Sequence, residues 1–218
     1  MTRLALFDLD GTILDTLSDL ASAVNWALSS ENQPRRSTEE IRSFLGNGIR
    51  SLVHLSLSEN ASEDTEKKVF DSFVNYYGEH CADKTTPYDD IPELFAELRN
   101  RGIKIAVVSN KADFAAQKLC KKFFSGAYDF ALGAKDGVAK KPARDMIDEC
   151  LSAFPEISSE ECVYIGDSEV DVETAKNAGM RGIAVQWGFR STDELKKAGA
   201  TVFAATPKEL FQKIIGEN

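Results

Sequence analysis

The chain has 218 residues, of which 43% are hydrophobic and 28% are charged. This length and composition predict a folded protein with one sizeable core, or a core with a small accessory domain, and exclude an extensively disordered chain. The formal net charge is −9, and the basic residues are scattered among acidic ones, so a nucleic-acid partner is not expected.

The cysteines and apolar runs restrict the setting of the protein. The cysteines are far apart and form no CxxC pair, so neither a structural zinc site nor a redox dithiol is expected. No signal-peptide core follows Met1, and no apolar run approaches membrane-spanning length. We therefore expect a cytoplasmic protein without a membrane partner.

Short apolar runs predict buried strands at several places along the chain: Leu4–Phe7, Ile103–Val108, Tyr128–Leu132, Val163–Ile165 and Ile183–Val185. Segments with helical spacing lie between most of them: Ile91–Asn100, Ala112–Phe124, Ala143–Phe154 and Val170–Ala178. This alternation predicts an α/β fold in which a doubly wound, Rossmann-like parallel sheet is covered by crossover helices.

The segment between residues 15 and 87 breaks this alternation. It contains no convincing strand, only the helical patterns Leu17–Leu28, Thr38–Leu45, Ile49–Leu57 and Glu63–Tyr77. Ser37 followed by Glu40 is typical of a capped helix start, and Trp26, Phe73 and Tyr77 are expected in a small helical core. The sequence therefore predicts a discontinuous α/β core, 1–14 and 88–218, interrupted by an all-helical domain, 15–87.

Two aspartates, Asp8 and Asp10, follow the first predicted strand. Ligands of α/β sheets bind beyond the carboxyl ends of the strands, where this pair would lie. Two carboxylates this close repel each other at neutral pH unless a cation or a shared proton offsets the charge. For this segment alone, an ordinary turn rich in Asp and Gly is the alternative interpretation.

A second acidic cluster, Gly166–Asp171, follows the predicted strand Val163–Ile165. Asp167 and Asp171 would point to the same edge of the sheet as the first pair. Carboxylates that converge in this way form an all-oxygen site, which suits Mg²⁺ better than Zn²⁺. Considered alone, Ser168 and Asp171 could simply cap the helix that follows.

Groups suited to an anion lie at two further places. Ser109 and Asn110 follow the strand Ile103–Val108, and Lys141 leads into a helix. A hydroxyl, nearby backbone N–H groups and a mobile lysine are usual ligands of phosphoryl oxygens. Each is common on protein surfaces, but their placement relative to the two acidic clusters indicates one shared site.

In this order the motifs resemble those of the haloacid dehalogenase superfamily: Asp8–Thr12, Ser109–Asn110, Lys141–Pro142 and Gly166–Asp171. The resemblance spans the chain and implies the α/β core of that family. A helical insertion after the first motif is similar to the cap of the subgroup that contains phosphoglycolate phosphatases, pyrophosphatases and β-phosphoglucomutases. Within it, Ile41–Gly48, Pro87–Tyr88, Ser109–Lys111 and Trp187–Phe189 favour the phosphoglycolate phosphatases.

The resemblance and the residue chemistry together predict catalytic roles. Asp8 would be the nucleophile that forms an aspartyl-phosphate, and Asp10 would be the general acid and then the general base. Lys141 would hold a phosphoryl oxygen and ease repulsion between Asp8 and the substrate. Mg²⁺ would be held by Asp8, the Asp10 carbonyl oxygen and Asp167, with Asp171 supporting or joining them.

Substrate binding is expected from two regions. Ser109, Asn110 and Lys111 would contact the substrate from the core. The cap loop Gly46, Asn47 and Gly48 would approach it with backbone N–H groups. The alternative for the loop is that its glycines merely end one helix and start the next.

The expected function is Mg²⁺-dependent hydrolysis of a small phosphorylated metabolite, 2-phosphoglycolate in the first place, by a monomer or homodimer. A pyrophosphatase and a β-phosphoglucomutase-like phosphotransferase stay open as alternatives within the family. A catalytically silent binding protein is the alternative of a different class. It is disfavoured because the nucleophile, acid–base, lysine and metal positions all keep reactive residues.

Overall fold

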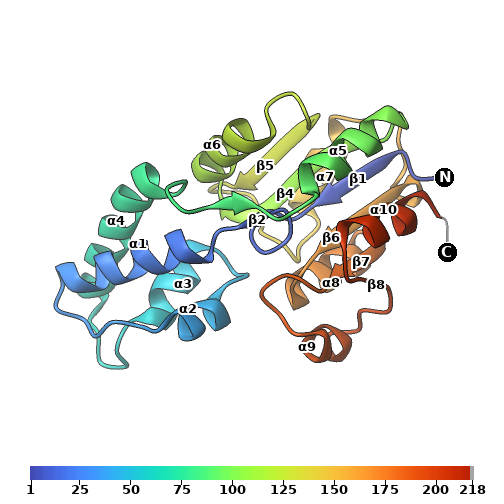
Figure 1. Cartoon of the computed structure of the whole chain (residues 1–218). Helices are drawn as coiled ribbons and strands as arrows, with labels where there is room; N and C mark the ends of the chain where they lie inside the picture. The colour runs from blue at the N-terminus through green and yellow to red at the C-terminus, as the bar shows by residue number, and fades with distance from the viewer. Residues whose placement is uncertain (217–218) are drawn as a thin grey trace. The chain divides into compact units, whose positions relative to one another are not determined.

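A computed structural model describes residues 1–216 of the chain (Figure 1). The described chain forms two compact units, which we call the α/β unit and the helical unit. The α/β unit contains Met1–Asp15 and the chain from Pro87 onward, and the helical unit contains Thr16–Thr86. The last two residues of the predicted core, 217 and 218, lie outside the described residues.

The α/β unit is built on a six-stranded sheet of order β5-β4-β1-β6-β7-β8 whose neighbours are parallel. The strands are β1 (Leu4–Phe7), β4 (Lys104–Ala112), β5 (Phe130–Ala134), β6 (Cys162–Gly166), β7 (Arg181–Val185) and β8 (Phe203–Ala204). All side chains of β1 are buried, as expected for a central strand covered on both faces. The predicted doubly wound α/β fold is confirmed.

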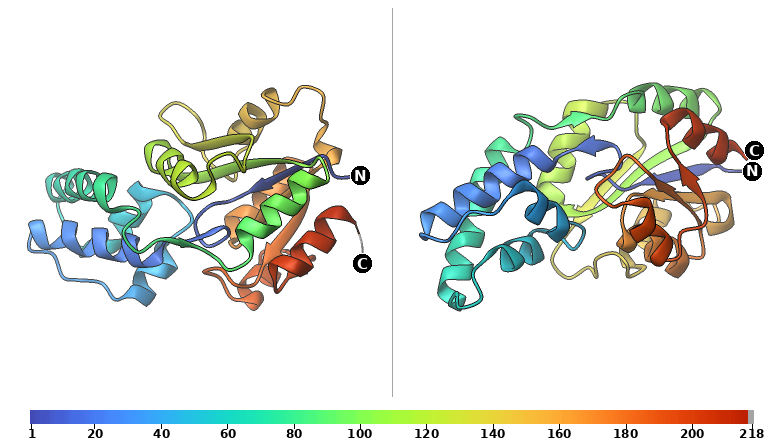
Figure 2. Two further views of the ribbon diagram at one scale, coloured as in Figure 1. Left: turned by 45° about the horizontal axis from the view of Figure 1, so that its top comes forward. Right: turned by 60° about the horizontal axis from the view of Figure 1, so that its bottom comes forward.

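Helices cover both faces of this sheet (Figure 2). The helices of the unit are α5 (Ile91–Asn100), α6 (Asp113–Phe124), α7 (Asp145–Ser152), α8 (Glu169–Asn177), α9 (Thr192–Lys197) and α10 (Pro207–Ile215), with a 3₁₀ turn at Ser159–Glu161. Because strand side chains alternate between faces, Leu4 and Leu6 pack with α7 and α8 on one side. Phe7 points to the other side, where its ring contacts Phe95 of α5.

The strand order determines where a ligand can bind. The chain passes from β1 to β4 and β5 on one side and then crosses back to β6 on the other side of β1. At such a reversal the loops after neighbouring strands diverge and leave a crevice beyond the carboxyl ends. In this unit, β1, β4 and β6 end beside that crevice.

The helical unit consists of α1 (Leu17–Ser30), α2 (Thr38–Phe44), α3 (Ile49–Ser56) and α4 (Glu63–His80). Phe73 and Tyr77 are buried in its core, and Ser37 forms the predicted capping box with Glu40. The prediction for Trp26 is wrong: this side chain is 58% exposed and stacks on Tyr76. Its large ring covers the surface of α4 instead of entering the core.

Short strands flank the helical segment, where the sequence predicts none. β2 (Leu14–Asp15) and β3 (Thr86–Pro87) form a two-stranded ribbon. Strands of two residues carry no periodic pattern, so the sequence could not reveal them. Among residues 1–216, no helix combines the length and the apolar character that a membrane span requires.

Candidate active site

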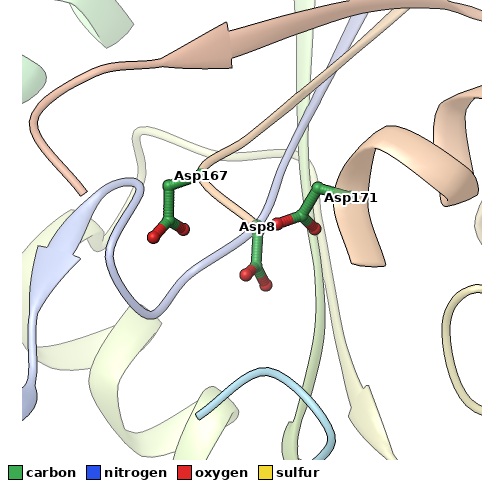
Figure 3. A group of neighbouring side chains, drawn as sticks. All are labelled: Asp8, Asp167 and Asp171. Carbon is green, nitrogen blue, oxygen red and sulfur yellow. The ribbon is translucent and has the colours of Figure 1, made fainter. Parts of the chain in front are cut away.

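Three aspartates gather beyond the carboxyl ends of β1 and β6 (Figure 3). Asp8 directly follows β1, Asp167 directly follows β6, and Asp171 lies in the first turn of α8. One carboxylate oxygen from each lies within 4.8 Å of the others, and all three residues are buried. One acid of the first predicted cluster, Asp8, and two of the second, Asp167 and Asp171, therefore lie together.

Glycines make this dense packing possible. A side chain at Gly11 or at Gly188 would overlap the Asp167 carboxyl group, and one at Gly166 would overlap Asp171. The backbone at Gly11 also has φ of +80°, which favours glycine. Close backbone approach thus brings the acids together.

Asp167 is fixed by two hydrogen bonds. The Thr12 hydroxyl donates to Oδ1 at 2.9 Å, and the Phe189 backbone N–H donates to Oδ2 at 2.7 Å. Burial raises the pKa of Asp167 to about 8, and the negative charges of Asp171 and Asp8 add to the rise while the two hydrogen bonds oppose it. Neither Thr12 nor Phe189 is among the predicted site residues, although both lie in motifs that carry the family resemblance.

Lys141 is the cation of the site. Its Nζ lies 2.8 Å from Asp8 Oδ1, 2.9 Å from Asp171 Oδ1 and 2.8 Å from the Tyr164 hydroxyl. Burial alone would lower the pKa of Lys141, but the carboxylates of Asp171 and Asp8 overcome this effect and hold it well above its usual value. The ammonium group is therefore charged at neutral pH. Tyr164 was not predicted, because a tyrosine within an apolar strand carries no functional signal.

Asp8 has a raised pKa of about 6. Burial is the largest cause, and Asp171 adds to the rise, whereas the charge of Lys141 lowers the pKa. The carboxyl group is thus mostly ionised at neutral pH, although it is buried.

Asp171 uses both carboxylate oxygens within the protein. Oδ2 accepts from the backbone N–H and hydroxyl of Ser168, at 3.1 Å and 2.6 Å, in a capping box at the start of α8. Oδ1 accepts from Lys141 and from Tyr164. From the sequence, capping of the helix and a place in the acidic site were alternative interpretations of Asp171. In the structure, Asp171 does both.

Asp10 points to a different partner. Its carboxylate oxygens lie 2.8 Å and 3.2 Å from Nζ of Lys111. The Lys111 side chain is only 1% exposed, whereas that of Asp10 is 21% exposed. An ion pair therefore holds Asp10 at the rim of the site. The substrate contact predicted for Lys111 stays a prediction.

Ser109 and Asn110 lie within β4 rather than after it. The strand was predicted to end at Val108, but it continues to Ala112 with a shift in register after Val108. Ser109 is buried, and the Asn110 side-chain amide donates to the Lys141 carbonyl oxygen at 2.9 Å. Asn110 thus orients the backbone that carries the lysine.

Gly46, Asn47 and Gly48 form the turn between α2 and α3 of the helical unit. The glycines have φ of +116° and +82°, and Gly48 is the N-terminal cap of α3. Locally, they end one helix and start the next. Their predicted role in substrate binding stays a prediction.

The acidic cluster fits a small, hard divalent cation. Its donors are carboxylate oxygens, the ligands that Mg²⁺ prefers. Burial together with like charges raises the pKa values of Asp8 and Asp167, and a bound cation would offset this crowding of negative charge. The glycines packed around Asp167 add to a cradle of fixed shape.

Comparison with known proteins identifies the class. The family model of haloacid dehalogenase-like hydrolases matches residues 5–185, so the chain belongs to this family, as the motifs predict.

Named relatives are phosphatases. The chain is 30% identical to a phosphoglycolate phosphatase of Aquifex aeolicus over 86% of each protein. It is 28% identical to the N-acetylmuramic acid 6-phosphate phosphatase of Pseudomonas aeruginosa over 96% of this chain and 93% of the relative. A crystal structure from Lactobacillus delbrueckii subsp. bulgaricus, provisionally named a phosphoglycolate phosphatase, matches with a TM-score of 0.93 and 40% identity over 100% of both chains.

Proposed function

We propose that the protein is a Mg²⁺-dependent phosphatase that hydrolyses a small phosphomonoester through an aspartyl-phosphate on Asp8. The observation that carries this proposal is the position of Asp8: it is buried at the end of β1, 2.8 Å from the charged Lys141 and next to Asp167. A carboxylate in this setting can attack an anionic phosphoryl group because the neighbouring positive charge offsets the repulsion. The named phosphatase relatives support the same reaction.

In the first step, a carboxylate oxygen of Asp8 attacks phosphorus, and the bond from phosphorus to the ester oxygen breaks. Asp10 donates a proton to the departing oxygen, so the alcohol leaves neutral. Lys141 holds a phosphoryl oxygen, and Ser109 contributes its hydroxyl. Their positive and dipolar charges stabilise the transition state more than the ground state.

In the second step, water attacks the phosphorus of the aspartyl-phosphate. Asp10, now ionised, takes a proton from that water, and the bond between phosphorus and Asp8 breaks. Inorganic phosphate leaves, and the Asp8 carboxylate is regenerated. Lys111, whose Nζ lies 2.8 Å from Asp10 Oδ1, holds the Asp10 side chain for both transfers. The contact is a hydrogen bond while Asp10 carries its proton and an ion pair once Asp10 is ionised.

Asp8, Asp167 and the Asp10 carbonyl oxygen are the groups that would hold Mg²⁺. When bound, the ion supplies charge neutralisation and orientation of the phosphoryl group. Asp171 supports this set through Lys141, because its own oxygens already accept hydrogen bonds. A direct contact from Asp171 to the metal would require one of these bonds to exchange.

For the substrate, we propose 2-phosphoglycolate, with residues 15–87 acting as a cap that selects it. The phosphoglycolate phosphatases among the relatives support this choice. The similarly related N-acetylmuramic acid 6-phosphate phosphatase makes a sugar phosphate the second candidate. Gly46, Asn47 and Gly48 are the cap residues proposed to contact the substrate.

Phosphate release from a panel of substrates, with Mg²⁺ and with EDTA, tests the proposal. The panel contains 2-phosphoglycolate, pyrophosphate, β-glucose 1-phosphate and N-acetylmuramic acid 6-phosphate. We expect Mg²⁺-dependent release that is fastest from 2-phosphoglycolate and absent in Asp8→Asn, whose amide cannot attack phosphorus. Isomerisation of β-glucose 1-phosphate without release would show a phosphotransferase instead. Conversion of no member would contradict the proposed substrates and favour the catalytically silent binding protein.

A further inference from the structure

The segment Trp187–Arg190, which follows β7, surrounds Asp167. The Trp187 indole Nε1–H donates to the Thr12 carbonyl oxygen at 3.0 Å. Gly188 packs so closely on Asp167 that a side chain there would overlap it, and the Phe189 N–H bonds the carboxylate. Successive residues of this segment thus fix one acid.

These contacts close into a ring. Trp187 holds the carbonyl group of Thr12, and the hydroxyl of Thr12 donates to Oδ1 of Asp167. Oδ2 accepts a hydrogen bond from the Phe189 backbone N–H, and Phe189 belongs to the same segment as Trp187, so the ring of contacts is closed. Each carboxylate oxygen accepts one of these bonds and keeps further lone-pair capacity for a cation.

Arg190 anchors the end of the segment. Its guanidinium lies 2.9 Å and 3.3 Å from the two carboxylate oxygens of Glu169, the first residue of α8. The Arg190 side chain is largely buried. The segment is therefore tied to the two structures that flank Asp167, the turn with Thr12 and the start of α8.

We propose that Trp187–Arg190 is a positioning segment for the metal site: it holds the Asp167 carboxylate in the orientation that Mg²⁺ binding requires. This inference rests on the proposed function, in which Asp167 binds the ion. One oxygen each of Asp8, Asp167 and Asp171 lies within 4.8 Å of the others, so these carboxylates repel one another when they are ionised. The fixed donors on both Asp167 oxygens hold its carboxylate in place against that repulsion.

Two variants test the segment, each with a matched control. Gly188→Ala introduces a methyl group against Asp167, and Trp187→Phe keeps a ring but removes the indole donor. Gly182→Ala is the glycine control, since its methyl group would meet Ala175 at 3.0 Å and no site residue. Trp26→Phe is the tryptophan control, because Trp26 is an exposed residue of the helical unit.

The first readout is the Mg²⁺ concentration that gives half of the maximal rise in melting temperature, measured without substrate. Groups that orient a ligand typically contribute about tenfold to a hundredfold in metal affinity. We expect Gly188→Ala to need about a hundredfold more Mg²⁺ and Trp187→Phe about tenfold more, with both controls unchanged. If Gly188→Ala does not fold, as judged by circular dichroism, Trp187→Phe decides.

The second readout is phosphate release over a range of Mg²⁺ concentrations. Saturating Mg²⁺ should restore most of the rate in both variants, whereas general damage to the fold would not respond to the metal. Wild-type metal requirements in Gly188→Ala and Trp187→Phe would overturn the inference and leave the proposed function standing. No response of the wild-type protein to Mg²⁺ would overturn the proposed function, and the inference with it.

Discussion

The charges of the site meet at Lys141, which contacts Asp8, Asp171 and Tyr164. Lys141→Ala would leave two buried carboxylates without their cation. Loss of one partner from a buried pair costs about 3–5 kcal/mol, and loss of one transition-state donor costs about a hundredfold to a thousandfold in rate. We therefore expect both the free energy of unfolding and kcat/KM to fall by these amounts. Urea denaturation and steady-state kinetics measure the two effects.

The neighbouring lysine supplies the control. Lys140 is adjacent in sequence but has none of these contacts, so Lys140→Ala should change neither quantity appreciably. A normal kcat/KM in Lys141→Ala would contradict the phosphoryl-binding role.

Lys111 is the partner of Asp10 rather than an exposed cation. Lys111→Met keeps the length of the side chain but removes the charge that orients Asp10, and a misplaced catalytic group can cost about a hundredfold in rate. The loss should be large for an alkyl phosphate, whose leaving oxygen needs a proton. It should be small for p-nitrophenyl phosphate, whose leaving group is stable as an anion. Values of kcat/KM measure the difference, because they report the first chemical step and not the later attack of water, which also uses Asp10. The exposed Lys118→Met is the control. Equal losses for both would argue against positioning of Asp10.

Asp167 and Asp8 should make the metal-free protein less stable as pH rises. Their folded pKa values, about 8 and about 6, exceed the reference value of 3.8, so between pH 4 and 8 the folded state binds more protons than the unfolded state. The free energy of unfolding must then decrease with pH in that window. Urea denaturation in EDTA should show lower stability at pH 8 than at pH 6.

The isosteric Asp167→Asn supplies the control for this pH dependence, because its amide does not titrate. It should remove most of the loss between pH 6 and 8, where Asp167 is the main contributor. Mg²⁺ should raise the melting temperature of the wild type more at pH 8 than at pH 6, because the ion binds the ionised acids. A wild type and variant with parallel pH profiles would contradict the raised pKa of Asp167.

At the scale of elements, clear apolar runs and helix start signals were sufficient to predict the bounds of an element from the sequence. The predicted bounds of β1 and α5 match the structure, since β1 is an apolar run directly followed by Asp8 and α5 begins beside Pro92. No element is predicted after Val185. β8 is too short to show a period, whereas α10 has start and stop signals in the sequence, at Thr206 and Gly216.

The sequence was enough to predict which acidic residues form the site, but not which groups contact each of them. The ends of parallel strands must share one edge, so Asp8 and Asp167 could be placed together from sequence. The contact of Lys111 with Asp10 joins residues 101 positions apart, and the bond from Phe189 to Asp167 uses a backbone N–H. Neither contact can be predicted from the local residue pattern, because both depend on the strand register and on the path of the loops.

Asp19 connects the beginning and the end of the helical unit. It is buried in the first turn of α1 and accepts hydrogen bonds from the backbone N–H groups of Lys84 and Thr85, at 2.9 Å and 2.8 Å. Asp19→Ala would leave these donors unsatisfied, which costs about 1–3 kcal/mol for each group that stays buried. We expect the free energy of unfolding to fall by about 3 kcal/mol in urea denaturation. Amide exchange at Lys84 and Thr85 should accelerate, and the exposed Asp71→Ala should show neither effect.

At the scale of the whole molecule, the two proposed roles belong to different units: the reaction to the α/β unit and the choice of substrate to the helical unit. All charged groups that the proposed mechanism uses belong to the α/β unit. On this proposal, changes in the helical unit would alter which phosphomonoester reacts without altering the attack by Asp8. This separation makes substrate preference and catalytic chemistry independently measurable.

Gly48 offers the test of the proposed cap. Gly48→Ala adds a side chain to the turn before α3, at a backbone φ of +82° that only glycine adopts readily. If this turn approaches the substrate, the variant should lose about tenfold in kcat/KM for 2-phosphoglycolate. The loss should be smaller for p-nitrophenyl phosphate, a generic ester that makes no specific contacts with the loop.

Gly199→Ala has a similar positive φ, +99°, in the α/β unit and no neighbour within 4 Å, so it controls for backbone strain. Comparison of kcat/KM for both substrates, alongside melting temperatures, separates strain from recognition. Equal losses for the two substrates in Gly48→Ala would mean that the turn only connects α2 and α3, and substrate choice would then have to reside elsewhere.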